Sequence, residues 1–157
     1  MTQAFTAWML LSGDSCMAVL YCGIIKMKSL PPPPLHPQVS HILNVAFGVE
    51  NVFPDLFIYK TVSILDHPDA DLLLHIQDCC DFIQQARSEK GVVLVHCNAG
   101  VSRAPAVVTG YLMSCDGQSF NDALSLVKSA RPASSPNPGF LEQLKGCKTL
   151  MMNGSKH

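Results

Sequence analysis

The segment from Val92 to Met113 constrains the fold more than any other part of the sequence. It begins with the apolar run Val92-Val93-Leu94-Val95, which has the length and branching of a buried strand. A short loop follows, and residues 104–113 then read as the start of a helix. A strand that passes through a small loop into a helix gathers backbone N–H groups at the helix N-terminus, where anions bind. The segment therefore predicts an anion site on an α/β unit.

The loop of this segment carries both a nucleophile and a fixed cation. Its sequence is His96-Cys97-Asn98-Ala99-Gly100-Val101-Ser102-Arg103. Helix N-termini and adjacent cations favour the thiolate, so we expect Cys97 to be largely thiolate at neutral pH. The Arg103 guanidinium offers paired donors that match two phosphoryl oxygens. A lone cysteine after a core strand is more often a buried structural thiol, but this combination in one loop favours phosphate chemistry.

Two other loop residues have expected roles of their own. Gly100 lets the backbone turn tightly towards a bound anion. Ser102 is placed to donate a hydrogen bond to the sulfur of Cys97, which would make that sulfur a better leaving group. We therefore expect the loop to bind a phosphoryl group and to support both its capture and its release.

The pattern His96-Cys97-x-x-Gly100-x-Ser102-Arg103 resembles the signature of the cysteine-dependent protein phosphatases, specifically their dual-specificity branch. Two other stretches agree with it. Residues 41–45 resemble the second-strand segment of that family, and residues 134–144 resemble its Pro-Asn-x-Gly-Phe entry to the C-terminal helix. The resemblance covers about residues 39–148 and is nearest to small atypical members that act on stress-kinase pathways. It implies hydrolysis of phosphotyrosine and phosphoserine or phosphothreonine through a phosphocysteine on Cys97, without a cofactor.

The resemblance also assigns the phosphate-binding residues and narrows the substrate. Phosphoinositide phosphatases of the same superfamily carry lysines within the loop, whereas the positions here are uncharged, which favours a phosphoprotein. Tyrosine-only phosphatases typically follow the arginine with Thr-Gly, whereas this chain has Ala-Pro. The expected phosphate-binding residues are Asn98, Ala99, Gly100, Val101, Ser102 and Arg103.

A general acid must protonate the leaving oxygen. The family carries this aspartate some thirty residues before the cysteine, and Asp66 lies 31 residues before Cys97, after a strand-like run. Asp69 and Asp71 are nearby alternatives, although either could instead cap the helix that follows. We expect Asp66 to be the acid and then, once ionised, the base that activates water, with Asp69 as the main alternative.

Supporting roles are implied for residues outside the loop. His96 is expected to orient the loop through hydrogen bonds. Asn137 matches the family's asparagine that braces the phosphate loop, although it could equally be a plain turn residue between Pro136 and Pro138. Gln143 faces the same region in the family. The remaining histidines have no ligand-like spacing, so no metal is implied.

The order of the expected elements defines the fold class. Strands are predicted over residues 42–45, 59–65 and 92–95. Helices are predicted over residues 71–88, 104–115, 120–130 and 139–151. Ser119 and Asp122 form a capping-box start for the third of these helices. Strands that alternate with helices predict an α/β cysteine-phosphatase fold, with a mostly parallel sheet and a site at the carboxyl ends of its strands.

The first 38 residues depart from the family pattern. Leu20 to Gly23 faintly resembles its first strand and turn, but Pro31-Pro32-Pro33-Pro34 stands where a helix belongs, and four prolines cannot lie in a helix interior. We therefore expect the amino-terminal strand and helix to be altered or missing. The predicted domains are a proline-rich, disordered leader over 1–38, a catalytic domain over 39–150 and a tail over 151–157. The proline run is also a weak candidate for an SH3-type contact.

Composition limits the partners and the compartment. The net charge is −1, so nothing favours nucleic acid or an anionic membrane. Residues 4–25 are mostly apolar, but Asp14 interrupts them and no cation precedes them, so we expect neither a signal peptide nor a membrane helix. The seven cysteines are odd in number and fit a reducing compartment, cytoplasmic or also nuclear. One of them is a candidate to resolve an oxidised Cys97.

Two functions follow from these patterns. The first is a dual-specificity protein phosphatase that acts on MAP kinase pathway proteins. The second is a weakly active or inactive protein that binds or scaffolds phosphoproteins, because the altered amino terminus leaves the domain unstable. The loop chemistry favours the first, and the proline run favours the second.

Overall fold

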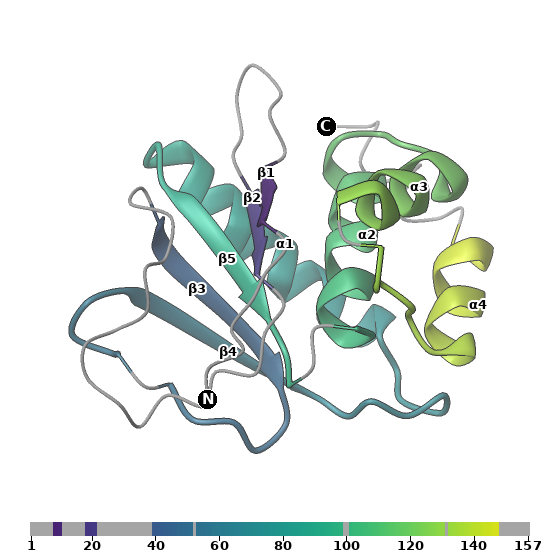
Figure 1. Ribbon diagram of the computed structural model, residues 1–157, viewed down its shortest axis with the longest axis horizontal. Coiled ribbons are helices and arrows are strands. Elements are labelled where there is room, and N and C mark those ends of the chain that lie inside the picture. The colour runs from purple at the N-terminus through teal and green to yellow at the C-terminus, as the bar shows by residue number, and fades with distance from the viewer. Residues whose placement is uncertain are drawn as a thin grey trace.

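The computed structural model describes residues 8–10, 18–21, 39–51, 53–98, 101–130 and 132–147. Within this part of the chain the strands form a five-stranded sheet in the order β1-β2-β5-β3-β4 (Figure 1). β2 pairs with β5 in parallel, and β3 pairs in parallel with both β4 and β5; the β1–β2 pair is antiparallel. The strands are β1 (Trp8–Leu10), β2 (Ala18–Tyr21), β3 (Val39–Ala46), β4 (Ile58–Ile64) and β5 (Val92–His96).

Four helices accompany the sheet in the described residues. Figure 1 shows α1 behind the sheet, with α2, α3 and α4 grouped at one side of it. The α3 bounds match the prediction, and its first turn is capped as predicted, because Asp122 N–H donates to Ser119 Oγ at 3.1 Å. The helices are α1 (Leu73–Ser88), α2 (Arg103–Cys115), α3 (Phe120–Ala130) and α4 (Pro138–Gly146). The predicted α/β fold with a mostly parallel sheet is therefore confirmed.

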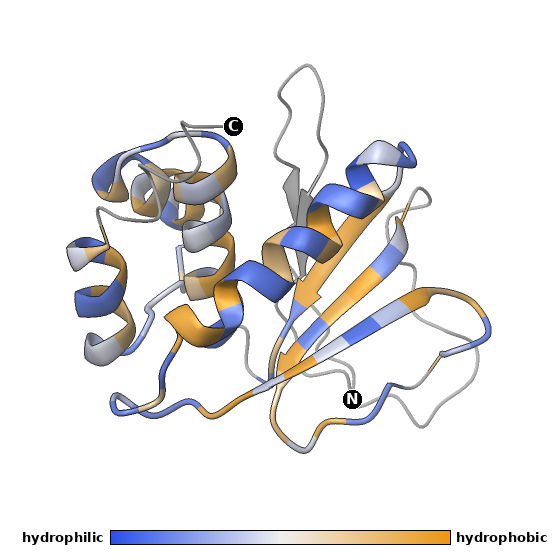
Figure 2. Cartoon of the chain, turned by 180° about the vertical axis from the view of Figure 1, so that it is seen from behind, coloured by the Kyte–Doolittle hydropathy of each residue, from blue (hydrophilic) through white to orange (hydrophobic). Residues whose placement is uncertain are grey.

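The main core lies between the sheet and the helices. Every residue of α2 from Arg103 to Met113 is buried, as expected for a helix enclosed on all sides. By contrast, α1 buries one stripe, formed by Ile76, Cys79, Cys80, Ile83 and Ala86. Figure 2 shows the side of α1 that faces away from the sheet as largely hydrophilic, and the central strands as mostly hydrophobic. The burial of α2 fixes the helix whose first turn follows the Cys97 loop.

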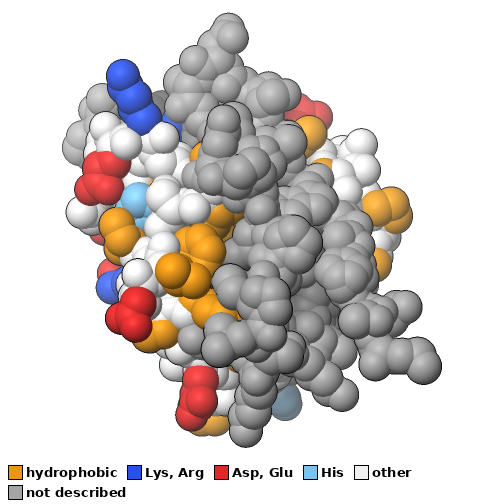
Figure 3. Space-filling model, turned by 60° about the vertical axis from the view of Figure 1, so that its left-hand side comes forward, with side chains coloured by type: hydrophobic (Ala, Val, Ile, Leu, Met, Phe, Trp, Pro, Cys, Tyr) orange, Lys and Arg blue, Asp and Glu red, His pale blue; other side chains and the backbone are white. Residues whose placement is uncertain are grey.

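A second apolar cluster lies on the other side of the sheet. Val39, Ile42, Val92 and Leu94 are buried there, and Phe57 and Tyr59 pack against them. Figure 3 shows hydrophobic side chains gathered on this side of the molecule, next to atoms that are not described. The central strands thus bury both of their faces, as parallel strands do.

The leader contributes to the sheet. Residues 18–21 form β2 beside β5, so this stretch of the first 38 residues is a strand next to the one that precedes Cys97. The expected change in the following helix, the proline run Pro31–Pro34 and its SH3-type contact fall outside the described residues. The domain boundary placed at residue 39 stays a prediction.

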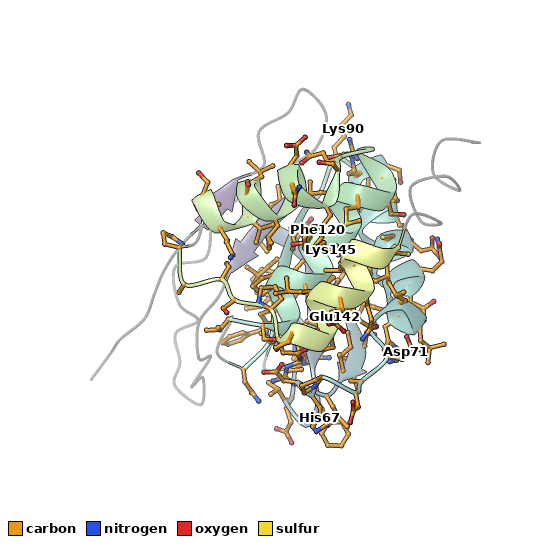
Figure 4. All side chains as sticks on the ribbon, turned by 90° about the vertical axis from the view of Figure 1, so that its right-hand side faces the viewer. His67, Asp71, Lys90, Phe120, Glu142 and Lys145 are labelled. Carbon is orange, nitrogen blue, oxygen red and sulfur yellow. The ribbon has the colours of Figure 1, made fainter. Side chains whose placement is uncertain are left out.

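The last helix is shorter than expected. It was predicted to run from Gly139 to about Met151, but α4 ends at Gly146, followed by Cys147 with φ −89° and ψ 66°. The periodic apolar pattern continues past this point in the sequence, which explains the overestimate. The N-terminal end of α4 faces the residues that follow β4, where Asn137 donates a hydrogen bond to Asp66 (Figure 4).

Candidate active site

Cys97 lies at the carboxyl end of β5, directly before the turn into α2. Its side chain is buried, and the backbone N–H of Ala104 in the first turn of α2 donates to its sulfur at 3.5 Å. A helix N-terminus carries partial positive charge, and an N–H that points at a sulfur stabilises a negative charge there. The strand and the helix therefore place the Cys97 sulfur against the N-terminal end of α2.

The loop after Cys97 is described at both of its ends. Asn98 is exposed and Val101 is half-buried, while Ala99 and Gly100 lie outside the described residues. The Val101 carbonyl accepts a hydrogen bond of 2.7 Å from the backbone N–H of Ser135. The chain between α3 and α4 therefore runs alongside the loop and supports it.

Arg103 is buried at the first position of α2. One of its terminal nitrogens donates to the carbonyl of Ile64, the last residue of β4, at 2.9 Å. A guanidinium has five N–H donors, so this bond leaves others for phosphoryl oxygens. The bond also fixes the arginine relative to the strand end that leads to Asp66.

Asp66 follows β4 and is exposed. Its carboxylate accepts a 3.0 Å hydrogen bond from the side-chain amide of Asn137. The alternative acid, Asp69, lies 3.8 Å from His67 on the surface. Asp71 accepts from the backbone N–H of Leu74 at 3.1 Å, as expected of a residue at a helix start. Of these three carboxylates, Asp66 is the one that the described hydrogen bonds connect, through Asn137, to Ser102 in the Cys97 loop.

Asn137 connects three parts of the site. Its backbone N–H donates to Ser102 Oγ at 2.9 Å, and its side-chain oxygen accepts from Phe140 N–H at 2.9 Å, which caps α4. Its side-chain amide holds Asp66. Asn137 thus joins the Cys97 loop, the loop that carries Asp66 and α4, and it is more than a turn residue.

The structure places Ser102 against Asn137. Ser102 Oγ accepts from the backbone of Asn137 and retains its own proton for another acceptor. The predicted bond from this hydroxyl to the Cys97 sulfur stays a prediction.

His96 is buried at the end of β5, and its Nδ1 lies 3.5 Å from the Cys97 carbonyl oxygen. Burial lowers the pKa of His96 to about 4, because the charged imidazolium loses its solvation. At neutral pH this histidine is uncharged. It therefore adds no positive charge to the loop, and its observed contact there is the one with the Cys97 carbonyl.

α4 also contacts the residues between Asp66 and α1. Figure 4 shows α4 lying beside the loop that carries His67 and Asp71. The Gln143 side chain reaches the start of α1, and Gly139 packs so closely on the Pro68 carbonyl that a Cβ would collide with it. The family resemblance implies a general location for Gln143 but no partners, and the sequence pattern does not predict the close approach at Gly139. The signal in the sequence is a glycine in the first turn of a helix, two residues after its N-cap.

In the part of the chain that the structure describes, no group of three or more His, Cys, Asp or Glu side chains is arranged to hold a metal ion. None of the described helices is long and apolar enough to span a bilayer.

Comparisons with known proteins agree with this geometry. Residues 20–149 match the family model described as the dual specificity phosphatase catalytic domain. Mouse dual specificity protein phosphatase 19 is 60% identical over 108 residues, which are 69% of this chain and 49% of the mouse protein. Dual specificity protein phosphatase 1 of Arabidopsis thaliana is 40% identical over 132 residues, which cover 84% of this chain and 67% of that protein.

A solved structure supports the same assignment. Human tyrosine phosphatase-like serine/threonine/tyrosine-interacting protein superposes with a TM-score of 0.76 and 30% identity, over 85% of this chain and 93% of the human one. The chain belongs to the dual-specificity phosphatase family, in the cysteine-dependent phosphatase superfamily. The match spans about half the length of the mouse relative.

Proposed function

We propose that this chain is a protein phosphatase that hydrolyses phosphotyrosine and phosphoserine or phosphothreonine through a phosphocysteine on Cys97. The observation that carries the proposal is the position of Cys97, buried at the N-terminus of α2 with an N–H directed at its sulfur. Arg103, held in the same loop, supplies the cation for the phosphoryl oxygens. Family membership supports the same reaction class.

In the first step the Cys97 thiolate attacks phosphorus. The S–P bond forms and the bond from phosphorus to the substrate oxygen breaks, with the transferring phosphoryl group held by Arg103 and the N–H groups of the loop. Asp66 donates its proton to the departing alkoxide or phenoxide. The products are the phosphocysteine and the dephosphorylated protein.

In the second step water attacks the phosphocysteine. Asp66, now ionised, accepts a proton from the water as the O–P bond forms. The S–P bond breaks and the electron pair returns to sulfur. Ser102 donates its hydroxyl proton in a hydrogen bond that stabilises the departing thiolate. Inorganic phosphate leaves, and Asp66 is again protonated for the next cycle.

The expected substrate is a phosphoprotein. Asn98 and Val101 add no charge to the described loop, so an inositol headgroup with several phosphates would meet Arg103 as the loop's cation. We propose components of stress-activated MAP kinase pathways, in the cytoplasm or the nucleus, as the natural substrates. This choice is supported by the resemblance to small atypical members of the family.

Hydrolysis of 4-nitrophenyl phosphate by the purified full chain tests the reaction class. Cys97→Ser should abolish turnover while it retains binding of a phosphopeptide, because the cradle is kept and the nucleophile is lost. A folded wild-type protein without turnover would refute the proposal.

The role of Asp66 is tested against that of Asp69. Asp66→Asn should lower kcat/KM for a phosphoserine peptide by about 10²–10⁴-fold, the usual contribution of a general acid. It should lower kcat/KM for 4-nitrophenyl phosphate much less, since that leaving group departs without a proton and kcat/KM does not include the attack of water on the phosphocysteine. Asp69→Asn is the matched control, and a larger effect from it would move the role to Asp69.

A phosphoprotein-binding protein with weak turnover is the second candidate. It is supported by the fold similarity to the human protein that is named phosphatase-like and interacting. This candidate predicts phosphopeptide binding by the wild type with weak or no turnover, and the same binding by Cys97→Ser. The turnover assay therefore separates the two functions.

A further inference from the structure

We infer that Gln143 is a positioning residue for the general acid: it fixes the loop that carries Asp66 to α4, although it lies outside the Cys97 loop. The inference rests on the proposed function and names a further residue on which its first step depends.

Both ends of the Gln143 amide are used. Its side-chain oxygen accepts from the backbone N–H of Leu72 at 2.8 Å and of Leu73 at 3.4 Å. Its side-chain nitrogen donates to the carbonyl of Ala70 at 2.8 Å. A neutral amide that both accepts and donates matches this pattern of backbone groups. Gln143 therefore holds the segment from Ala70 to Leu73 in one arrangement.

α1 depends on these contacts because its own sequence supplies little capping. Leu72 stands at its N-cap position without a side-chain hydrogen bond, and its first turn contains no acidic residue. The first N–H groups of a helix have no partner within the helix and need an external acceptor. Gln143 provides that acceptor from another helix, and Asp71 serves the next N–H, that of Leu74.

The loop between β4 and α1, which carries Asp66 and is called the acid loop, is held by α4 along its whole length. Asn137, at the N-cap of α4, bonds to Asp66 at the start of the loop. Gly139, in the first turn, packs against Pro68 in the middle. Gln143, one turn further on, holds Ala70 at the end. One short helix thus fixes the loop at three successive points, so a loss at Gln143 releases the end where α1 begins.

A positioning role makes a prediction that a purely structural role does not. Asp66 is the acid in the first step and the base in the second, so its role as acid is read from kcat/KM, which covers only the steps up to departure of the leaving group. A misplaced acid lowers kcat/KM only for substrates whose leaving group needs a proton. A shift of about 1 Å in a catalytic group can cost roughly 10²-fold. The dependence of the rate on the leaving group therefore reports the position of Asp66 separately from the stability of the fold.

The experiment compares Gln143→Ala with wild type on two substrates, a phosphoserine peptide and 4-nitrophenyl phosphate. We expect kcat/KM for the peptide to fall about 10- to 100-fold and kcat/KM for the aryl phosphate to change less than about threefold. The control is Glu142→Ala, at the exposed neighbouring position on α4, which should match wild type on both substrates (Figure 4).

A second variant separates the two halves of the contact. Gln143→Glu keeps an acceptor for the N–H groups of Leu72 and Leu73 but places a carboxylate oxygen against the Ala70 carbonyl. Gln143→Glu should therefore keep the first turn of α1 folded and still lose rate on the peptide more than on the aryl phosphate. It replaces Gln143→Ala in the experiment if that variant does not fold.

The outcomes are distinct. Suppose that the wild type turns over both substrates. If the Gln143 variants then lose rate equally on both, or if neither variant loses rate, the role of Gln143 is refuted and the proposed function stands. A folded wild type with no turnover of either substrate would overturn both.

Discussion

The side-chain amide of Asn137 donates a 3.0 Å hydrogen bond to the carboxylate of Asp66, which is 71 residues away in the sequence. The same asparagine contacts Ser102 through its backbone and caps α4 through its side-chain oxygen. One residue therefore sets the distance between the nucleophile loop and the expected acid.

Replacing Asn137 should separate its catalytic and structural contributions. Asn137→Ala loses the α4 cap and should lower the free energy of unfolding by about 1 kcal/mol. Asn137→Ser keeps a capping oxygen but is too short to reach Asp66, so it should retain stability. Both variants should lose rate on phosphoserine peptides more than on 4-nitrophenyl phosphate. Urea unfolding and the two rates check this, and a Ser variant with wild-type rates would contradict it.

Gly139→Ala should destabilise the fold and disturb the acid loop. The added Cβ would collide with the Pro68 carbonyl, which is backbone and cannot rotate away. Overpacking of this kind costs about 1–3 kcal/mol. Gly146→Ala on the same helix is the matched control, because a Cβ there meets nothing within 4 Å. Equal unfolding free energies for the two variants in urea would refute this prediction.

The parts of the fold that were predictable are those in which the chemistry is local. The strand before Cys97, the helix after it and the capped start of α3 depend on residues only a few positions apart. The family resemblance placed Asn137 near the loop. The partners of Gln143 and the contact of Gly139 with Pro68 were not predictable, because they join residues about 70 positions apart.

The leader illustrates a second limit. Residues 18–21 pair with β5 as a strand, whereas the proline run in the same leader predicts that its strand and helix are altered or missing. Strand pairing depends on a distant partner, so a four-residue strand gives only a weak signal by itself.

Cys115 should be the most reactive of three neighbouring cysteines towards alkylation. A hydrogen bond from the Cys80 thiol lowers the pKa of Cys115 to about 7, so near neutral pH much of it is thiolate. Burial raises the pKa of Cys79 to about 12, and the bond to Cys115 raises the pKa of Cys80. Iodoacetamide at pH 7 should therefore label Cys115 first, as measured by peptide mass spectrometry.

The Cys80→Ala variant is the control for that prediction. It removes the donor that stabilises the Cys115 thiolate, so labelling of Cys115 at pH 7 should slow. Labelling of Cys79 at the same rate as Cys115 in the native wild type would contradict the assignment, as would an unchanged rate in Cys80→Ala.

His96 should make stability depend on pH in a defined window. Its pKa falls from 6.5 to about 4 in the fold because of burial, so between these values the unfolded chain binds a proton that the native state does not. The free energy of unfolding should therefore fall as pH is lowered through this window, by up to about 1.4 kcal/mol per pH unit. Above pH 6.5 both states are neutral and the contribution vanishes.

The measurement is urea unfolding of wild type and His96→Gln at several pH values from 7.5 to 4. The carboxylates titrate in both proteins, so the difference between the two curves isolates the histidine. As the pH falls below about 6.5, the free energy of unfolding of the wild type should fall relative to that of His96→Gln. A difference that stays constant over the whole range would show that His96 titrates normally in the native state, and therefore that the loop around Cys97 admits water.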